Sequence, residues 1–386
     1  MRYSWAAPGL FLLALAVNCS KNEKLPYGVG LVDRIDTGAV KAVEIAPPVA
    51  EVSYERGRVT TGKSPYLLAG EADGYRAAIL IRFAALPDSS VVDRATLWLS
   101  PASYRGAPAA LALSAQQVTA AWSEDSVTWA NFSGDGGPQV GWATMLAGDS
   151  VRVGIPIEPG LVGGWIDSSV ANYGLYITAS GPALQEFHSL QATDTTRCPR
   201  LELSYVRKGV ADTALFKPSG DAFLVTYAGS LPPGRLMIAN ATGWRVLVKF
   251  SLDSIPSDAT INRARLELWL DQSLTKLRDT GMAIAGRPIV SEPWNPPDVA
   301  VDTTMSVPVA AIVKASEKLT FSVSSEIADF TAIVQAWTSG RLPNRGLMLY
   351  SMGEGLDASE AVLFSADGDA GMVPRLLVEY TVPPRP

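Results

Sequence analysis

The sequence predicts an all-β protein made of two tandem jelly-roll-like β-sandwich domains, with a short helix in the second. Three observations lead to this fold class: short runs of alternating apolar and polar residues, frequent turn residues, and motifs that occur twice in the same order. The alternation is clearest in Ala95–Leu99 and Ala264–Leu270. A period of two is typical of strands with one buried face, and many short strands separated by turns are typical of sandwiches.

Residues 1–18 predict a signal peptide. Arg2 precedes the apolar stretch Trp5–Val17, which is too short to span a hydrocarbon core of about 30 Å. The stretch ends in Leu15–Ser20, which resembles a bacterial lipobox, with Asn18 in place of the usual small residue. We therefore expect Cys19 to be lipidated and to begin the mature chain. The alternative is ordinary secretion.

Residues 19–48 predict a lipid-anchored tether, because Ser20–Lys24 and the residues that follow form a polar lead. No later segment is apolar over 18 residues, so the lipid is expected to be the sole membrane attachment. Serine after the cysteine favours the outer membrane of a Gram-negative cell. We expect an outer-membrane lipoprotein that is periplasmic or surface-exposed.

The rest of the chain predicts two copies of one unit, at residues 49–206 and 207–386. The matched motifs keep their order, and their offset drifts only from 167 to 175 positions. They are Ile79–Phe83 with Val246–Phe250, Val92–Leu97 with Ile261–Leu266, Trp122 with Trp294, Trp165 with Trp337, and Pro199–Leu201 with Pro374–Leu376. A repeat of this length indicates a duplicated globular domain.

One segment of the second copy has helical spacing. Ile327, Phe330, Val334 and Trp337 recur at intervals of three and four, which predicts a short helix that caps one end of the sandwich. Its counterpart in the first copy, Pro159–Trp165, is rich in glycine. We expect that segment to be frayed or only one turn long.

These motifs together resemble the DNRLRE domain, also classed as carbohydrate-binding module family ninety-six. The resemblance covers nearly all of residues 49–382 and is closest at Trp122–Asn131 and at the closing Pro199–Tyr205 and Pro374–Tyr380. The literal string DNRLRE is absent, and the second copy replaces most of the region that matches Trp129–Asn131. The resemblance implies a jelly-roll-like sandwich and, for some members, binding of acidic or neutral polysaccharide.

Composition excludes several function classes. Lys and Arg total 32 against 38 Asp and Glu, so the net charge of −6 argues against nucleic-acid binding. One histidine and two cysteines exclude zinc sites built from several Cys and His ligands. If Cys19 is acylated, Cys198 has no disulfide partner in the chain. His188 occupies the position of Phe364 in the other copy, which favours a structural role.

The sequence predicts no enzyme. Glu124 and Asp125 form a carboxylate pair inside a motif, but adjacent residues on a strand point to opposite faces. A glycosidase needs two carboxyl groups facing each other at about 5 to 10 Å. The second copy has Pro296 and Pro297 at these positions, so we interpret the pair as turn residues.

Trp98 and Trp269 are candidate carbohydrate contacts, because both lie on the polar parity of their strands, opposite the leucines. An exposed indole can stack against the C–H groups of a pyranose. The alternative is that these rings pack beneath a loop or against the other domain. Tyr104 and Trp142, near turns or strand ends, are further candidate contacts.

Asp194 in the first copy and the pair Asp367 and Asp369 in the second lie in equivalent late loops. Such loops can offer oxygens to Ca²⁺, so we consider a structural calcium. The alternative is a plain Asx turn at each position. No other cofactor is expected.

The sequence thus predicts a non-catalytic, lipid-anchored envelope protein that binds polysaccharide through tandem modules. Two tethered sites would raise the overall affinity through effective concentration. The alternative is a structural or adhesive envelope protein whose sandwiches act as spacers or bind a protein partner.

Overall fold

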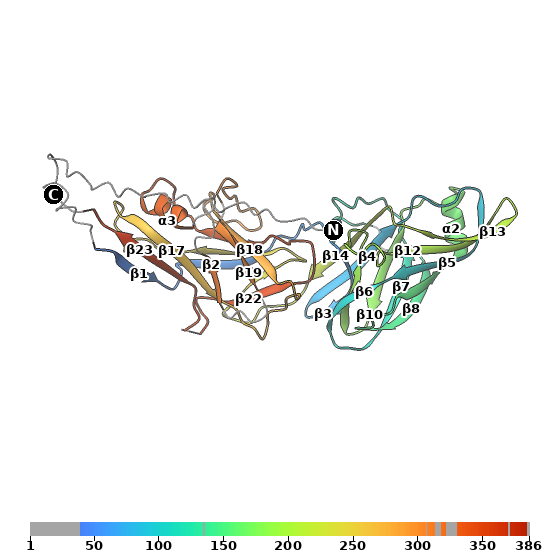
Figure 1. Cartoon of the computed structure of the whole chain (residues 1–386), viewed down its shortest axis with the longest axis horizontal. Coiled ribbons are helices and arrows are strands. Elements are labelled where there is room, and N and C mark those ends of the chain that lie inside the picture. The colour runs from blue at the N-terminus through green and yellow to red at the C-terminus, as the bar shows by residue number, and fades with distance from the viewer. Residues whose placement is uncertain are drawn as a thin grey trace, which may run out of the picture. The chain divides into compact units, whose positions relative to one another are not determined.

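The computed structural model describes residues 39–133, 136–305, 307–312, 318–321, 330–369 and 371–383 (Figure 1). Residues 40–383 belong to one compact unit. Within the described ranges the protein is all-β with two helices, which confirms the predicted fold class. The predicted signal peptide at 1–18, Cys19 and most of the predicted tether lie outside these ranges.

Twelve strands form a first sheet, which we call the N-terminal sandwich. They are β3 (Tyr66–Ala72), β4 (Tyr75–Arg82), β5 (Ser90–Leu99), β6 (Pro101–Gly106), β7 (Ala110–Gln117), β8 (Gln139–Leu146), β9 (Val153–Ile157), β10 (Leu175–Ser180), β11 (Ala183–His188), β12 (Arg200–Arg207), β13 (Val210–Phe216) and β14 (Gly220–Tyr227).

This sheet follows the order β13-β12-β5-β9-β8-β7-β10-β4-β3-β11-β6, and β14 also pairs with β4. β6 starts directly after β5, so the last strand of the path returns to a strand near its beginning. The sheet therefore curls over its own core. Ile79, Leu97 and Leu201 are completely buried in that core, whereas Thr96 and Trp98 on the other face of β5 are half-buried. The predicted alternation is confirmed there.

The other strands form what we call the C-terminal sandwich. They are β1 (Lys41–Ile45), β2 (Ala50–Glu55), β15 (Arg235–Ala239), β16 (Trp244–Lys249), β17 (Thr260–Trp269), β18 (Met282–Pro288), β19 (Val307–Ile312), β20 (Lys318–Phe321), β21 (Leu347–Ser351), β22 (Glu360–Phe364) and β23 (Arg375–Thr381).

Two sheets enclose the core of the C-terminal sandwich. One has the order β19-β18-β21-β16-β2 and the other the order β1-β23-β17-β20, while β15 and β22 form a separate pair. Val246 and Leu349 of the first sheet meet Leu266 and Val378 of the second in a single apolar cluster. Burial of these side chains is the main stabilising contribution to the sandwich.

The first two strands of the chain belong to the C-terminal sandwich. β1 pairs with β23, and β2 pairs with β16. Figure 1 shows both strands, in blue, among the orange and red strands of the C-terminal part. Conversely, β13 and β14 pair with β12 and β4 of the N-terminal sandwich. The sheets therefore divide differently from the predicted repeats at 49–206 and 207–386.

A tight hairpin explains this division. β12 and β13 are joined by Lys208 and Gly209, whose φ angles are 53° and 78°. Two central residues with positive φ are typical of a type I′ turn, which matches the twist of paired strands. Because this pairing is local in sequence, β13 and then β14 are taken up by the sandwich that precedes them. β1 and β2 then supply the corresponding pairings in the C-terminal sandwich.

Helix α3 (Phe330–Thr338) confirms the predicted short helix of the second half, although Ile327 lies outside the described ranges. Helix α2 (Pro159–Ile166) is longer than the single frayed turn that its glycines predict. Proline starts this helix, and Leu161, Val162 and Trp165 are buried by its packing. Tertiary burial therefore outweighs the low helix propensity of glycine here.

A pair of hydrogen bonds shows that the two sandwiches repeat the same local geometry. The indole nitrogen of Trp122 donates to the carbonyl of Tyr173 at 2.8 Å, and that of Trp294 donates to the carbonyl of Arg345 at 2.8 Å. In each case the acceptor lies shortly before a glycine with positive φ, at 174 and 346. The motif tryptophans therefore fasten a covering segment to the outer face of each sandwich.

Candidate functional site

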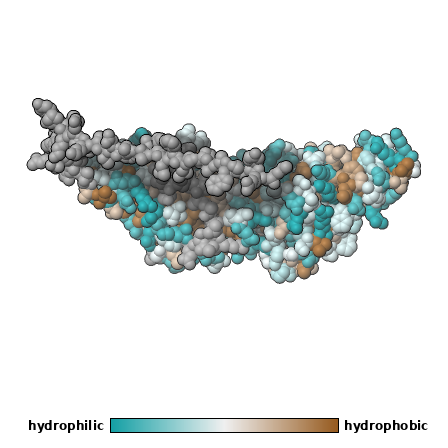
Figure 2. Space-filling view, viewed as in Figure 1, coloured by the Kyte–Doolittle hydropathy of each residue, from teal (hydrophilic) through white to brown (hydrophobic). Residues whose placement is uncertain are grey.

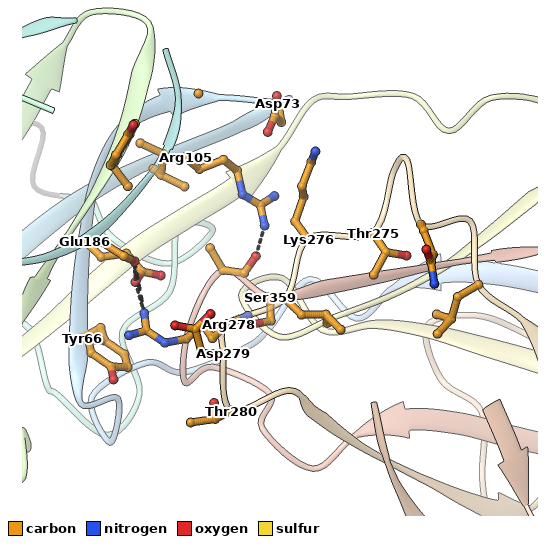
Figure 3. Close-up of a pocket in the computed structure, with 18 residues that line it drawn as sticks. Tyr66, Asp73, Arg105, Glu186, Thr275, Lys276, Arg278, Asp279, Thr280 and Ser359 are labelled. Atoms are coloured by element: carbon orange, nitrogen blue, oxygen red, sulfur yellow. Dashed lines mark hydrogen bonds and ion pairs between the residues drawn. The ribbon is translucent and has the colours of Figure 1, made fainter. Parts of the chain in front are cut away.

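A pocket of about 800 Å³ lies where β3, β6 and β11 of the N-terminal sandwich face the segment after β17 in the C-terminal sandwich (Figure 3). We call it the junction pocket. Polar and apolar atoms contribute similar shares of its surface. The polar and aromatic residues around it are Tyr66, Asp73, Ser103, Tyr104, Arg105, Glu186, Gln272, Thr275, Lys276, Arg278, Asp279, Thr280 and Ser359.

One side of the junction pocket is held by Arg278. Its guanidinium forms an ion pair with Glu186, and its Cζ lies 3.8 Å from the centre of the Tyr66 ring. The hydroxyl of Ser103 donates a hydrogen bond to the same carboxylate. Figure 3 shows Arg278 reaching from the C-terminal segment toward Glu186 and Tyr66. These contacts fix the side chains that form this wall.

A second ion pair lies at the opposite side. Arg105 Nη1 is 2.9 Å from Glu360 Oε1, and the Tyr75 hydroxyl donates to Glu360 Oε2 at 2.8 Å. Arg105 also donates to the carbonyl of Ala358. Burial raises the pKa of the Glu360 carboxyl, and the neighbouring Arg105 opposes that shift. The carboxylate is thus retained in the interior by its partners.

Several further groups of the junction pocket are open to solvent. Lys276, Gln272 and Thr280 are exposed, and the Lys276 ammonium makes no ion pair with a described residue. The Tyr104 side chain is 40% exposed and lies against Gly148, where a Cβ would be 2.8 Å from its ring. The pocket therefore combines an aromatic ring with hydroxyl, amide and ammonium groups.

The predicted aromatic contacts are not gathered in one place. Of the four, Tyr104 lines the junction pocket. Trp142 is 64% exposed on β8 and is absent from the lining. Trp98 is half-buried and covers Gly154, where a Cβ would lie 2.8 Å from the indole. Trp269 is half-buried between two cations, with Lys318 Nζ at 5.5 Å and Arg375 Cζ at 5.0 Å from its ring.

The predicted calcium ligands lie in turns. Asp194 accepts hydrogen bonds from the Thr196 hydroxyl at 2.6 Å and from its amide at 3.0 Å. These hydrogen bonds lower the pKa of Asp194. Asp367 and Asp369 are exposed in the corresponding turn of the C-terminal sandwich. Among the residues that the structure describes, no three His, Cys, Asp or Glu side chains gather as a metal site would require.

A buried carboxyl that the sequence analysis did not single out lies on β14. Asp221 is 1% exposed, and burial raises its pKa from 3.8 to about 7. Its Oδ2 accepts the amide hydrogen of Leu190 at 2.7 Å, while its Oδ1 has no partner among the described residues. The signal available was one acidic residue at the start of the apolar run Gly220–Tyr227.

Glu124 is a neighbour of Asp221 and accepts a hydrogen bond from Gln191 Nε2 at 2.5 Å. Burial raises its pKa, and that hydrogen bond opposes the shift. His188 is half-buried, and its pKa is lowered by burial and by Arg197 and Arg278. Asp221 and Glu124 together bind the loop after β11 through Leu190 and Gln191. Because Asp221 is enclosed, a substrate cannot reach its carboxyl group.

The surface seen in Figure 2 is mainly hydrophilic, and its hydrophobic side chains stand as separate spots. The most exposed large apolar side chains are on different elements, among them Val91, Val151 and Val210. Scattered exposure of this kind does not mark an apolar docking surface. Within the described residues, neither helix is long and apolar enough to cross a membrane.

Comparison with known proteins gives no close relative. No family model matches the chain, and no curated protein matches it. Among solved structures, it aligns with a chain described as BspA_C_WT at 10% identity, over 86% of this chain and 90% of that one, with a TM-score of 0.15.

Two further solved structures align at the same level. The Streptococcus agalactiae AgI/II polypeptide BspA C-terminal domain matches at 10% identity, over 86% and 91% of the two chains, with a TM-score of 0.14. A collagen adhesin from S. aureus matches at 8% identity, over 84% and 83%, with a TM-score of 0.11. Similarity this low does not establish a shared fold, and the architecture above rests on the strand pairing itself.

Proposed function

We propose that this protein binds polysaccharide without catalysis, through the junction pocket, and is held at the bacterial outer membrane by a lipid on Cys19. The observation on which this rests is a pocket of about 800 Å³ whose lining combines polar groups with an exposed tyrosine. That volume lies within the usual range of ligand sites. The motif resemblance to the DNRLRE domain supports the same ligand class.

The chemistry of the lining suits a polyhydroxylated ligand. Tyr104, which is among the lining residues, would offer aromatic surface to pyranose C–H groups, while Lys276, Gln272 and Thr280 would offer hydrogen bonds to sugar hydroxyls. The charges around the pocket have both signs, since Lys276, Arg105 and Arg278 are matched by Asp73, Asp279 and Glu186. We therefore expect a neutral glycan to bind in preference to a strongly acidic one.

A non-catalytic role is supported by the way in which the carboxylates are engaged. Glu186 and Glu360 both pair with arginines and accept hydroxyl hydrogen bonds, so they are positioned as structural anions. A glycosidase would need one of two facing carboxyls to act as an acid and the other as a nucleophile or base. Glutamates held in these pairs are poorly placed for either task.

The proposal is tested by glycan binding to the mature chain carrying Cys19→Ser. We expect Tyr104→Ala and Lys276→Ala each to weaken binding at least tenfold while the melting temperature is kept. Trp142→Ala is the matched control, because it removes an even more exposed ring outside the pocket. Binding that survives both pocket variants but is lost with Trp142→Ala would place the site on β8 instead.

The lipid anchor is tested separately. In cells fed a labelled fatty acid, the full chain should take up label, and Cys19→Ser should abolish that uptake. Unlabelled protein that is nonetheless exported would indicate ordinary secretion.

The alternative is a structural envelope protein. The pairing of β1 and β2 with strands of the C-terminal sandwich favours this function. Because β1 and β2 precede the N-terminal sandwich in the chain and the other C-terminal strands follow it, the N-terminal sandwich is inserted into the C-terminal one and two backbone connections join them. Two connections in place of one suit a spacer that must stay folded. Absence of binding to neutral and acidic glycans alike would support this function.

A further inference from the structure

We infer that a second saccharide-binding pocket lies on the outer face of β4, β7 and β10, and that bulky side chains fill the equivalent place among the described residues of the C-terminal sandwich. This inference rests on the proposed function and adds a site to it. The pocket has a volume of about 530 Å³. We call it the sheet-face pocket.

The wall of the sheet-face pocket is aromatic on one side. Trp129 and Tyr176 both line it, and Phe132 stacks on Tyr176 with ring centres 5.7 Å apart and an interplanar angle of 27°. Arg76 Cζ lies 5.5 Å from the centre of the Trp129 ring. Phe132 therefore supports the Tyr176 ring, and Arg76 supports the Trp129 ring. These contacts fix the orientation of both rings without a ligand.

The other side is polar and small. Thr178 and Ser180 come from β10, and Gln116 comes from β7. Arg76 and Glu71 form an exposed ion pair at 3.1 Å on the rim, so their charges offset each other. Hydroxyl and amide groups beside aromatic rings match the alternating polar and C–H faces of a neutral pyranose.

The register identifies the equivalent positions in the C-terminal sandwich. Leu175 of β10 pairs with Ile81, two residues before Phe83, and Leu347 of β21 pairs with Val248, two residues before Phe250. β10 and β21 are therefore the same strand of the repeated architecture.

Counting from these pairs, Thr178 corresponds to Tyr350, since each is three residues beyond its leucine. The partner strands give a second correspondence. Tyr176 pairs with Gln116 on β7, and Met348 pairs with Arg287 on β18, so Gln116 corresponds to Arg287.

At these positions the C-terminal sandwich is filled. The Tyr350 ring lies between two guanidinium groups, with Arg245 Cζ at 5.6 Å and Arg287 Cζ at 5.5 Å from its centre. Arg245 is itself fixed by two hydrogen bonds to Glu354, at 2.7 and 2.8 Å. A tyrosine with two stacked arginines occupies the volume that a threonine and a glutamine leave open in the N-terminal sandwich.

The comparison between the two sandwiches therefore identifies the variant that tests the inference. Thr178→Tyr places in the N-terminal sandwich the residue that fills the equivalent position of the C-terminal one. Thr144→Tyr, on the outward and exposed face of β8, is the matched control. Trp129→Ala is a second variant that removes the ring wall without adding bulk.

The measurement is calorimetric titration of the mature Cys19→Ser chain with neutral hexasaccharides of glucose and mannose, and with an acidic hexauronate. We expect two sites for a neutral probe. Thr178→Tyr and Trp129→Ala should each weaken one site at least tenfold and leave the other, whereas Thr144→Tyr should change neither.

The outcomes separate this inference from the proposed function. A single neutral-glycan site that Tyr104→Ala removes and Thr178→Tyr leaves intact would overturn the sheet-face pocket and keep the function. A site lost with Thr178→Tyr alone would support the sheet-face pocket and move the function away from the junction. Preference for the hexauronate at this site would overturn the neutral class, and no binding to any probe would overturn both proposals.

Discussion

The hydroxyl of Tyr75 donates a 2.8 Å hydrogen bond to Glu360, a residue 285 positions later in the chain. Tyr75 begins β4 in the N-terminal sandwich, and Glu360 begins β22 in the C-terminal one. Around them, Leu68, Phe223 and Ala358 belong to one apolar cluster to which both sandwiches contribute. The buried carboxylate therefore links the two sandwiches through one shared set of contacts.

Replacing Arg105 with methionine should destabilise the whole chain. It leaves the Glu360 carboxylate buried without its ion pair, and loss of one partner of a buried pair costs about 3 to 5 kcal/mol. We expect one cooperative unfolding transition whose midpoint lies at a lower guanidinium concentration than that of the natural protein. Tryptophan fluorescence and circular dichroism both monitor this transition. Exposed Arg76→Met, which removes the surface pair with Glu71, is the control and should cost less than about 1 kcal/mol. Two separate transitions would contradict the coupling.

Asp221→Asn should change how stability depends on pH. Burial raises the folded-state pKa to about 7, so between the unfolded value of 3.8 and pH 7 the folded state binds more protons. The stability that this group contributes is therefore fully present below about pH 4 and is lost as pH rises through 7.

Asparagine cannot ionise, but its side-chain oxygen can still accept the Leu190 amide hydrogen. Relative to the natural protein, the variant should therefore gain stability between pH 4 and pH 8, by about 4 kcal/mol at most at 1.36 kcal/mol per pKa unit. Urea unfolding at both pH values measures this difference. A difference that does not vary with pH would show that Asp221 has no shifted pKa.

The pairing of β13 and β14 with the N-terminal sandwich predicts which fragments fold. A fragment of residues 57–229 retains β13 and β14, whereas a fragment of 49–206 lacks both and leaves the edges of β12 and β4 unpaired. Unpaired edges promote aggregation. We expect the first fragment to be soluble, with protected amide hydrogens in β4 and β12, and the second to aggregate. Aggregation of the first fragment and solubility of the second would show that β13 and β14 are not needed to fold the N-terminal sandwich.

The equivalent hydrogen bonds of Trp122 and Trp294 predict that losing either one lowers the free energy of unfolding by a similar amount. Trp122→Phe and Trp294→Phe each leave a loop carbonyl without its indole donor, which should cost about 1 to 3 kcal/mol. Thermal unfolding of both variants measures these costs. Trp142→Phe is a suitable control, since that ring is 64% exposed and should change stability by less than about 0.5 kcal/mol. Costs that differ by more than about 2 kcal/mol between the two sandwiches would argue against equivalent geometry.

Much of the fold was predictable from short-range patterns. Alternation in Ala95–Leu99 predicts a strand with one buried face, and that strand lies in β5 with its leucines buried. Helical spacing of Phe330, Val334 and Trp337 predicts α3. These features depend on neighbours within a few residues, and the period of the pattern reports which face is buried.

The candidate site was predictable only in part. Tyr104 was expected as a contact and lines the junction pocket, whereas Arg278 and Lys276 gave no signal in their own sequence neighbourhood. Their role depends on strands of the other sandwich that lie far away in sequence. Trp129 belongs to a recognised motif, yet its place in a pocket depends on Tyr176 and Gln116 from two further strands.

The sequence by itself determined that the protein is built of strands, that its motifs occur twice, and which side chains face the core, because alternation and motif order are local properties of the chain. Only the tertiary structure decided that β1 and β2 complete the C-terminal sandwich and that Glu360 meets Arg105 and Tyr75. Pairing between distant strands depends on competition among equivalent edges, and the tight turn at Lys208 and Gly209 settles that competition in favour of the nearer sandwich.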